Sequence, residues 1–327
     1  MVKKEESISN RIMNSSKKSA VEFIRQIGIL IALIIVVVVF SALTPIFLTI
    51  SNLTNIVVQS SINGIIAVGM TMVIILGGID LSVGSVVALV GVVVATVMVN
   101  GASVFSAILI GLLIGALSGI FNGFLIARMN LQPFIVTLGT MTLLRGTALV
   151  YSHGDPIFRI NPLFRNIFAG SYAGIPGPII FLLLTAIIGF FILNYTKHGI
   201  YIQSVGGNEE ASRMSGVNVT RTKIVTYMTS GLVSALAALV MVGRLGAAEP
   251  IAGNGFELDA IAATAIGGTS MTGGKGNIPG TILGALILGA LRNGLTLMNV
   301  QSFYQLLASG AIILIAVIID RVTRGTK

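Results

Sequence analysis

The sequence contains no cysteine and no tryptophan, and only 9% of its 327 residues are charged. Without cysteine the chain has no disulfide framework, no thiol nucleophile and no thiolate metal site. Its two histidines, His153 and His198, stand far apart, so no metal site is predicted. Because an average soluble domain has about 25% charged residues, this scarcity of charge excludes an ordinary soluble fold.

Charge is scarcest near the N-terminus, where Asp80 is the one ionisable side chain between Gln26 and Ala127. A bilayer core about 30 Å thick needs roughly 20 apolar residues per helix, and only helices or closed barrels satisfy the backbone in hydrocarbon. The apolar runs are continuous rather than alternating, which favours helices over a barrel. The sequence therefore predicts an all-α polytopic membrane protein.

About ten apolar spans follow from the hydropathy pattern. They are expected near Ile27–Leu43, Ile56–Ile79, Leu81–Val99, Ala102–Ala127, Pro133–Val150, Ile179–Tyr195, Ile224–Val242, Leu258–Thr272, Ile278–Met298 and Phe303–Ile319. Together they make up a transmembrane permease domain over residues 25–320, between an N-terminal tail at 1–24 and a C-terminal tail at 321–327.

The distribution of lysine and arginine sets the orientation, since cytoplasmic loops of membrane proteins carry an excess of both. With about ten spans the two tails share one side with the loops that hold Arg128, Lys275 and the basic residues at 196–223. That side has fifteen basic residues against Arg159, Arg165 and Arg244 on the other. Both termini are therefore predicted to be cytoplasmic, and the net charge of +9 needs no nucleic-acid partner.

Two loops are longer than simple turns. The external loop at 151–178 is rich in proline, glycine and asparagine, which suits a surface that meets something outside the membrane. The cytoplasmic loop at 196–223 contains a short helix with a signal at each end, since Asn208 is a favoured N-cap and Gly216 suits a left-handed stop. Such a short helix is marginal alone. It is interpreted as a contact surface for a cytosolic partner or as a connector resting on the protein's own helix ends.

Three stretches carry a resemblance to a known family. They are Gly77-Gly78-Ile79-Asp80-Leu81-Ser82-Val83-Gly84-Ser85, the loop helix just described, and Gly253-Asn254-Gly255-Phe256-Glu257-Leu258-Asp259 continuing to Gly267-Gly268-Thr269-Ser270 and Gly273-Gly274-Lys275-Gly276. From about Arg25 to Ile319 the chain resembles the permease subunit of a ribose-type monosaccharide ABC importer.

The resemblance implies a multi-pass subunit of the bacterial cytoplasmic (inner) membrane that forms the translocation path for ribose or a related monosaccharide. Its implied partners are a second permease copy in a homodimer, a cytosolic ABC ATPase, a periplasmic or lipid-anchored sugar-binding protein, and membrane lipid. The subunit itself is expected to be no enzyme and to need no cofactor, because it lacks a phosphate-binding glycine loop. The family's ATPase-coupling segment corresponds to Asn208, Glu209, Glu210, Arg213, Met214, Ser215 and Gly216.

Two features within the spans point to the path. Asp80 can cap the following helix through the backbone N–H of Ser82 or Val83, or act in gating, and the cost of a mid-bilayer charge predicts a place near the cytoplasmic edge. The eighth span is interrupted by Gly267 and Gly268, and short, glycine-interrupted segments are typical of cavity-lining helices. The candidate path or gate residues are Gln59, Asn63, Asp80, Asn122, Glu257, Asp259 and Asn293, and for each asparagine an interhelical hydrogen bond is the alternative interpretation.

Internal similarity gives a further hypothesis. The stretch at 267–274 echoes the one at 77–84, with paired glycines followed by a hydroxyl residue, which an internal repeat would explain, parallel or inverted. Glycines at four-residue spacing, such as Gly111, Gly115 and Gly119, are interpreted as packing sites because small residues let helices approach closely in lipid.

A function of another class stays open. An ion-coupled secondary transporter of a small polar solute would normally need a buried acid or histidine near mid-membrane, and the acidic residues here are few. A passive channel is disfavoured by the docking helix, and an intramembrane enzyme by the absence of paired catalytic groups within one span.

Overall fold

The computed structural model describes residues 28–301, 303–308, 310–311, 314 and 318, so the predicted tails at 1–24 and 321–327 lie outside the described residues. After a first helix at Gly28–Leu43, the helices in chain order are α2 Ile50–Ile75, α3 Val83–Val99, α4 Val104–Arg128, α5 Pro133–Ser152, α6 Pro162–Ala169, α7 Gly177–Tyr195, α8 Lys197–Gly207, α9 Glu209–Met214, α10 Val219–Leu245, α11 Phe256–Ile266 and α12 Ile278–Leu297. Strands β1 Ser171–Tyr172 and β2 Ile175–Pro176 form a small antiparallel hairpin. Residues 303–308 are again helical.

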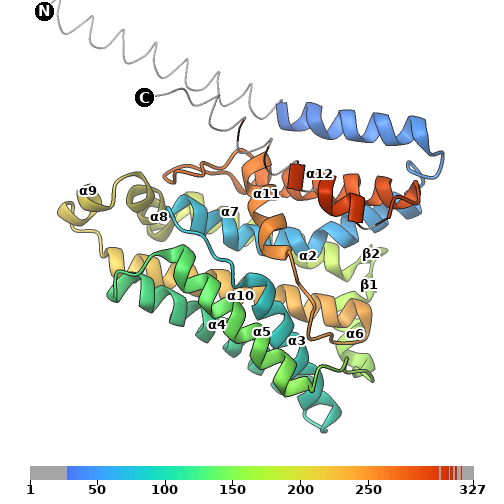
Figure 1. The fold of residues 1–327 in the computed structure, drawn as a ribbon, viewed down its shortest axis with the longest axis horizontal. Helices are drawn as coiled ribbons and strands as arrows, with labels where there is room; N and C mark the ends of the chain where they lie inside the picture. The colour runs from blue at the N-terminus through green and yellow to red at the C-terminus, as the bar shows by residue number, and fades with distance from the viewer. Residues whose placement is uncertain (1–27, 302, 309, 312–313, 315–317, 319–327) are drawn as a thin grey trace, which may run out of the picture.

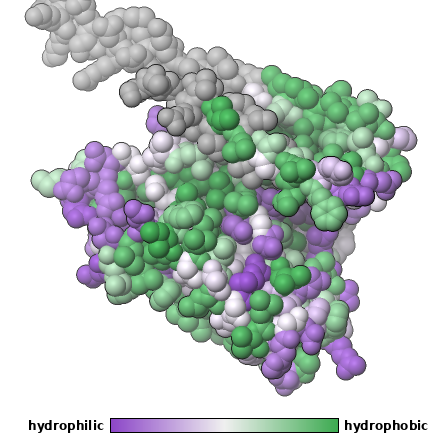
Figure 2. All heavy atoms as spheres, viewed as in Figure 1, coloured by the Kyte–Doolittle hydropathy of each residue, from purple (hydrophilic) through white to green (hydrophobic). Residues whose placement is uncertain are grey.

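The long helices lie side by side, with α8 and α9 at one end of the bundle and α6, β1 and β2 at the opposite end (Figure 1). Six of the described helices are long and apolar enough to cross a bilayer: α2, α4, α5, α7, α10 and α12. Figure 2 shows hydrophilic residues at the left and lower right ends of the molecule and a smaller group in the centre of this face, with hydrophobic residues over most of the rest. The prediction of a helical membrane protein is confirmed.

Helix α2 forms the centre of the bundle, where it packs against α7, α10, α11 and α12. Its side chains from Ile62 to Ile75 are almost all buried, which is expected of a helix that is apolar on every face. The outer helices instead turn large side chains such as Phe105, Leu109 and Ile187 outward. These exposed apolar side chains form the surface that a bilayer would cover.

Small residues set the distance between α4 and α10. A Cβ added at Gly115 would collide with the carbonyl oxygen of Gly231, and one at Gly119 would collide with that of Tyr227. Gly280 and Gly284 of α12 similarly face the backbone of α11. The prediction that these glycines serve packing is confirmed, because the partner backbone occupies the space a side chain would need.

Two segments break the helical pattern, at residues 76–82 between α2 and α3 and at 267–277 between α11 and α12. In the first, Gly77 has φ +89°, and in the second Gly268 has φ +83°. Both breaks also begin with the same two backbone hydrogen bonds. The N–H of the left-handed glycine donates to the carbonyl oxygen three residues earlier, and the next N–H donates to the carbonyl oxygen five residues before it. The matching pair is thus Gly77 and Gly268, one residue out of register with the echo in the sequence, and the repeat itself stays a prediction.

The interrupted eighth span is confirmed as a short helix. Helix α11 has 11 residues, or about 16 Å at 1.5 Å per residue, roughly half of a bilayer core. It starts at Phe256 and ends at Ile266, whereas the hydropathy pattern had extended the span to Thr272. The left-handed Gly268 stops the helix early, because the backbone turns there toward α12.

Replacing Gly115 with leucine should destabilise the protein by roughly 1–3 kcal/mol or more, since the new side chain would force α4 away from Gly231. The matched control is Gly139→Leu in α5, where a Cβ meets nothing within 4 Å. Thermal unfolding of both purified variants, followed by circular dichroism, checks the prediction. Equal melting temperatures for the two variants would contradict the packing role.

Candidate translocation cavity and docking segment

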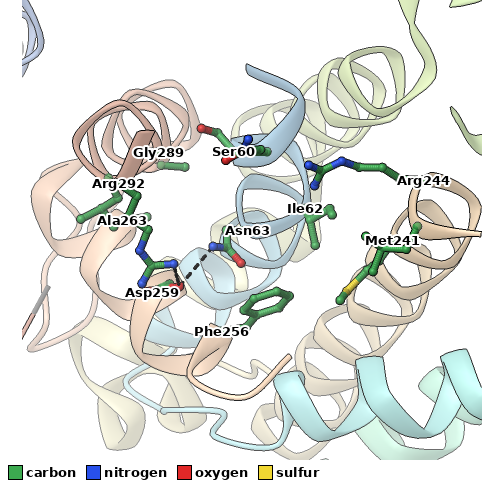
Figure 3. Close-up of a pocket in the computed structure, with 14 residues that line it drawn as sticks. Ser60, Ile62, Asn63, Met241, Arg244, Phe256, Asp259, Ala263, Gly289 and Arg292 are labelled. Atoms are coloured by element: carbon green, nitrogen blue, oxygen red, sulfur yellow. Dashed lines mark hydrogen bonds and ion pairs between the residues drawn. The ribbon is translucent and has the colours of Figure 1, made fainter. Parts of the chain in front are cut away.

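A cavity of about 220 Å³ lies between α2, α10, α11 and α12. It is lined by the last turns of α10 and by residues 59–63 in the middle of α2, so it lies beyond the middle of the bundle as seen from α8 and α9 (Figure 3). Its polar lining residues are Gln59, Ser60, Asn63, Arg244, Asp259 and Arg292. The volume far exceeds the roughly 10–15 Å³ that one water molecule needs, so the cavity can hold a small solute.

An ion pair forms one wall of this cavity. Arg292 of α12 donates from Nη1 to Asp259 Oδ2 at 2.7 Å and from Nη2 to Asp259 Oδ1 at 2.5 Å. Asn63 of α2 donates from Nδ2 to the same Oδ2 at 3.2 Å. The Asp259 side chain is only 7% exposed, and its charge is compensated by this two-bonded guanidinium. The ion pair therefore ties α2, α11 and α12 together at the cavity.

Arg244 lies on the other side of the cavity, in the last turn of α10. Figure 3 shows its side chain reaching from α10 toward α2. The charge pattern of the sequence places Arg244 among the basic residues of the external side and gives no sign that it lines a cavity. The signal that could have found it is an arginine within the final turn of a long apolar helix.

A second polar cluster surrounds Asp80, which is 1% exposed. The carboxylate accepts hydrogen bonds from the backbone N–H of Ser82 at 3.0 Å, from the Ser82 hydroxyl at 2.6 Å and from the Ser230 hydroxyl at 2.9 Å. Asn122 donates to Ser82 Oγ at 2.9 Å and accepts from Thr140 at 2.7 Å. The predicted hydrogen bond from the Ser82 N–H is confirmed, but Asp80 is not the N-cap of α3, because Ser82 holds that position and makes no side-chain cap bond.

The expectation that Asp80 lies near the cytoplasmic edge stays a prediction; within the bundle, its contact with Ser230 places it some way along α10. Ser230 lies eleven residues beyond the start of α10, a depth of about 16 Å along the helix. The carboxylate is tolerated inside the bundle because three donors replace the water it has lost.

The remaining path candidates lie apart from the cavity. Asn293 and Asn52 exchange two amide hydrogen bonds, Nδ2 to Oδ1 at 2.9 and 3.0 Å, between α12 and α2. Glu257 is buried against Gly84 of α3, on the side where Arg145 donates to the carbonyl oxygens of Pro250 and Ala252. Of the seven candidates the structure thus brings Gln59, Asn63 and Asp259 together at the cavity and places Asp80 with Asn122 in a separate cluster.

The docking helix α9 has the predicted caps. The Asn208 side chain accepts from the N–H of Ala211 at 2.9 Å, and Gly216 has φ +84°. Glu209 binds Arg213 at 3.1 Å within α9 and Lys223 of α10 at 2.8 Å. The Ser212 and Ser204 hydroxyls meet at 2.7 Å, which fastens α9 to α8. These contacts anchor the inner face of α9, while Met214 stands 81% exposed at its tip.

Helix α8 connects this docking segment to both helix breaks. A Cβ at Gly206 would collide with the carbonyl oxygen of Ile75 at the end of α2. The same carbonyl accepts a hydrogen bond from the N–H of Gly274 at 2.8 Å. The end of α8 and the loop at 267–277 therefore both touch the end of α2, directly before the 76–82 break.

No group of three or more metal-binding side chains that could hold a metal ion occurs among the residues that the structure describes. His198 in α8 lies near Thr226, with Nε2 3.3 Å from the hydroxyl. Burial, with a smaller effect from Arg221, lowers the pKa of His198 below its usual value. Its ring is therefore neutral at pH 7 and adds no charge beside the docking segment.

Comparison with known proteins gives consistent relatives. The family model described as "Branched-chain amino acid transport system / permease component" matches residues 52–317. The ribose import permease protein RbsC of Haemophilus influenzae is 47% identical over 301 residues, which cover 91% of this chain and 93% of that protein. RbsC of Bacillus subtilis is 47% identical over 299 residues, with 91% and 93% covered. The D-allose transport system permease protein AlsC of Escherichia coli is 44% identical over 296 residues, with 90% and 91% covered. No solved structure matches the chain significantly.

Replacing Arg292 with leucine should leave the Asp259 carboxylate buried without its counter-charge. The expected loss of stability is near the low end of roughly 3–5 kcal/mol, because the Arg292 side chain is 36% exposed. Adding Asp259→Asn to this variant should restore part of the loss, since the buried charge is then gone. Melting temperatures of the single and double variants test this, with the exposed Arg159→Leu as the control. A double variant that is less stable than Arg292→Leu alone would refute the assigned ion pair.

Proposed function

The chain belongs to the branched-chain amino acid transport system / permease component family, and from this we propose that it forms the membrane path for ribose or a related monosaccharide in an ATP-driven ABC importer. The observation that carries the proposal is the identity of 47% to ribose import permeases over more than nine tenths of the chain. The D-allose relative extends the comparison to a second monosaccharide. The protein is accordingly a multi-pass subunit of the bacterial inner membrane.

The arrangement in the membrane is proposed to comprise about ten helices with both termini cytoplasmic. Supporting this, the described helices alternate in direction, and α8 and α9 lie in the long basic loop at the end of the bundle (Figure 1). Lys197, Arg213, Arg221 and Lys223 all belong to that loop region, which the positive-inside rule assigns to the cytoplasm. The cavity near the last turn of α10 then opens toward the outer half of the membrane.

The proposed path includes the cavity residues Gln59, Asn63 and Asp259, with Asp80, Asn122, Glu257 and Asn293 as gate or supporting positions. Asp259 and Arg292 compensate each other, so this wall offers hydrogen-bonding groups without an unpaired charge. A neutral sugar is recognised by such groups. Asn293 is supported mainly as an interhelical bond because its amide is already paired with Asn52.

The energy is proposed to come from a separate cytosolic ATPase that docks on α9, with Asn208, Glu209, Glu210, Arg213, Met214, Ser215 and Gly216 as the coupling segment. Because α9 is anchored on its inner face and exposed at its tip, a movement of α9 would be transmitted to α8. Through Gly206 of α8 the movement would reach the end of α2 and the loop at 267–277. Both helix breaks lie along this route, and broken helices are typical of transport paths.

A second permease copy and an external sugar-binding protein complete the proposed assembly. The external loop at 151–178 suits the binding protein, because α6 and the hairpin give it a defined shape. Tyr172 fastens the hairpin to α6 by donating to the carbonyl oxygen of Asn166 at 2.9 Å. Lipid would cover the outward apolar faces of α4 and α7.

The rival function, an ion-coupled secondary transporter, is favoured by one observation. Asp80 is a buried carboxylate deep in the bundle, and such groups often mark proton or ion pathways. The uptake experiment below therefore separates the two functions.

The full chain, reconstituted in proteoliposomes with its ATPase and sugar-binding protein, should accumulate ribose only when ATP is supplied. A protonophore should leave uptake unchanged while ATP remains high, because no ion gradient drives the step. Uptake that continues without the ATPase, or that a protonophore abolishes at constant ATP, would instead support the ion-coupled rival. Radiolabelled sugar counted inside the vesicles is the measurement.

Replacing Met214 with aspartate should weaken association with the ATPase by roughly tenfold or more, because an exposed apolar tip is a typical interface anchor. The fold should persist, since the side chain is 81% exposed. Ile251→Asp is the matched control, because Ile251 is 64% exposed at the opposite end. Association is measured by pull-down of the ATPase with the full chain. Unchanged association for Met214→Asp would remove the docking assignment.

A further inference from the structure

The cavity wall formed by α2 contains an unpaired acceptor. Asn63 donates through Nδ2 to Asp259, but its Oδ1 is buried and has no hydrogen-bond partner among the residues that the structure describes. The Nδ2 contact fixes the orientation of the amide, so Oδ1 cannot exchange places with the nitrogen without losing that bond. A buried acceptor without a partner is rare in native structures and costly to keep, unless a ligand supplies the missing donor.

The opposite wall contains unused donors. Arg244 lines the same cavity from α10. Within the described part of the chain its guanidinium makes no hydrogen bond or ion pair, in contrast to that of Arg292. The guanidinium is half-buried and has five N–H donors and no acceptor. One cavity therefore presents an unused acceptor on α2 and a set of unused donors on α10.

A solute that satisfies both walls must donate a hydrogen bond to Asn63 Oδ1 and accept hydrogen bonds from Arg244. A hydroxyl group does both, and two adjacent hydroxyls match the fork of a guanidinium. A carboxylate would satisfy Arg244, but it has no proton to donate to Asn63 Oδ1 at neutral pH. The pair of walls thus favours a neutral polyhydroxylated molecule over a carboxylate.

Apolar side chains complete the cavity. Phe256, Met241, Ala263 and Leu288 line it between the polar walls, and Figure 3 shows Phe256 and Met241 between Asn63 and the α10 backbone. The C–H face of a sugar ring is apolar, so it can lie against such side chains while the hydroxyls reach the polar groups. A mostly apolar lining with few placed polar groups is typical of small-molecule sites.

We propose that Arg244 and Asn63 form a sugar-hydroxyl subsite in this cavity, with Arg244 donating to two neighbouring hydroxyls and Asn63 Oδ1 accepting from a third. The inference rests on the proposed function, whose solute class it deepens. Asp259 and Arg292 are positioning residues in this subsite, because they hold the Asn63 amide through Nδ2. The subsite makes the permease itself a contributor to sugar selection, in addition to any external binding protein.

The absence of cysteine from the chain allows a direct test. Leu245 lines the cavity beside Arg244 and is 48% exposed, so Leu245→Cys introduces a single reporter thiol. The full chain in lipid nanodiscs, without ATPase or binding protein, is treated with a maleimide at increasing ribose concentration. Ribose should slow alkylation, and acetate should protect less at equal concentration, because a carboxylate offers no donor to Asn63 Oδ1.

Two variants in the Leu245→Cys background test the residues. Arg244→Gln and Asn63→Leu should each raise the ribose concentration for half protection by about tenfold, the effect of losing a hydrogen bond to a charged or buried partner. Arg244→Lys should lie between, because it keeps the charge but loses the fork. The control is Arg159→Gln, at an exposed arginine outside the cavity, which should leave protection unchanged. An unaltered alkylation rate without sugar shows that a variant keeps its fold around the thiol.

The outcomes separate the subsite from the proposed function. Protection that is unaffected by both Arg244→Gln and Asn63→Leu, stronger protection by acetate than by ribose, or no protection while ATP-driven uptake is intact would each overturn the subsite. Protection that depends on Arg244 and Asn63 in a chain that shows no ATP-driven uptake would support the subsite and count against the importer assignment.

Discussion

Hydrocarbon offers no hydrogen bonds, and most of this structure follows from that constraint. Each polar group placed between the ends of the bundle must find its partner within the protein. Asp80 does so with three donors from Ser82 and Ser230, and Asp259 does so with Arg292 and Asn63. These are the places where helices that are distant in sequence are tied together. Two groups without a partner in the described part of the chain, Asn63 Oδ1 and the Arg244 guanidinium, line the same cavity, and there a solute can supply what the protein does not.

Close packing of helices through glycine is the second consequence of hydrocarbon surroundings. Between apolar helices in lipid the hydrophobic effect gives little attraction, so contact depends on how near two backbones can come. Gly115 and Gly231 bring α4 and α10 together, and Gly284 brings α12 against α11. The same device at Gly206 sets α8 against the end of α2. Under the proposed coupling, a movement of α9 would reach the end of α2 through backbone contacts, which deform less easily than flexible side chains.

The sequence indicates which residues of the candidate site are polar groups within apolar spans, but it does not indicate which of them lie together. The caps of α9 were predictable because Asn208 and Gly216 act within a single turn. The seven path candidates were chosen as polar groups in apolar spans, a criterion that cannot tell an interhelical pair such as Asn52 and Asn293 from a group that faces a cavity. Sequence alone does not mark Arg244 as a cavity residue, because an arginine at the end of a helix usually faces water or lipid headgroups. Nor does it show that Ser230, which is far away in the sequence, donates to Asp80 and lowers the cost of burying its charge.

The sequence by itself determined that the chain is a helical membrane protein, which termini of short helices are capped, and which family it resembles. Each of these depends on composition or on residues within a few positions of one another. Only the tertiary structure decided which polar groups meet, where Asp80 lies, and that the two helix breaks both adjoin the end of α2. The physical reason is that in an apolar bundle nearly every span satisfies the same hydropathy rule, so helix neighbours are chosen by the fit of small residues and by single hydrogen bonds between distant segments.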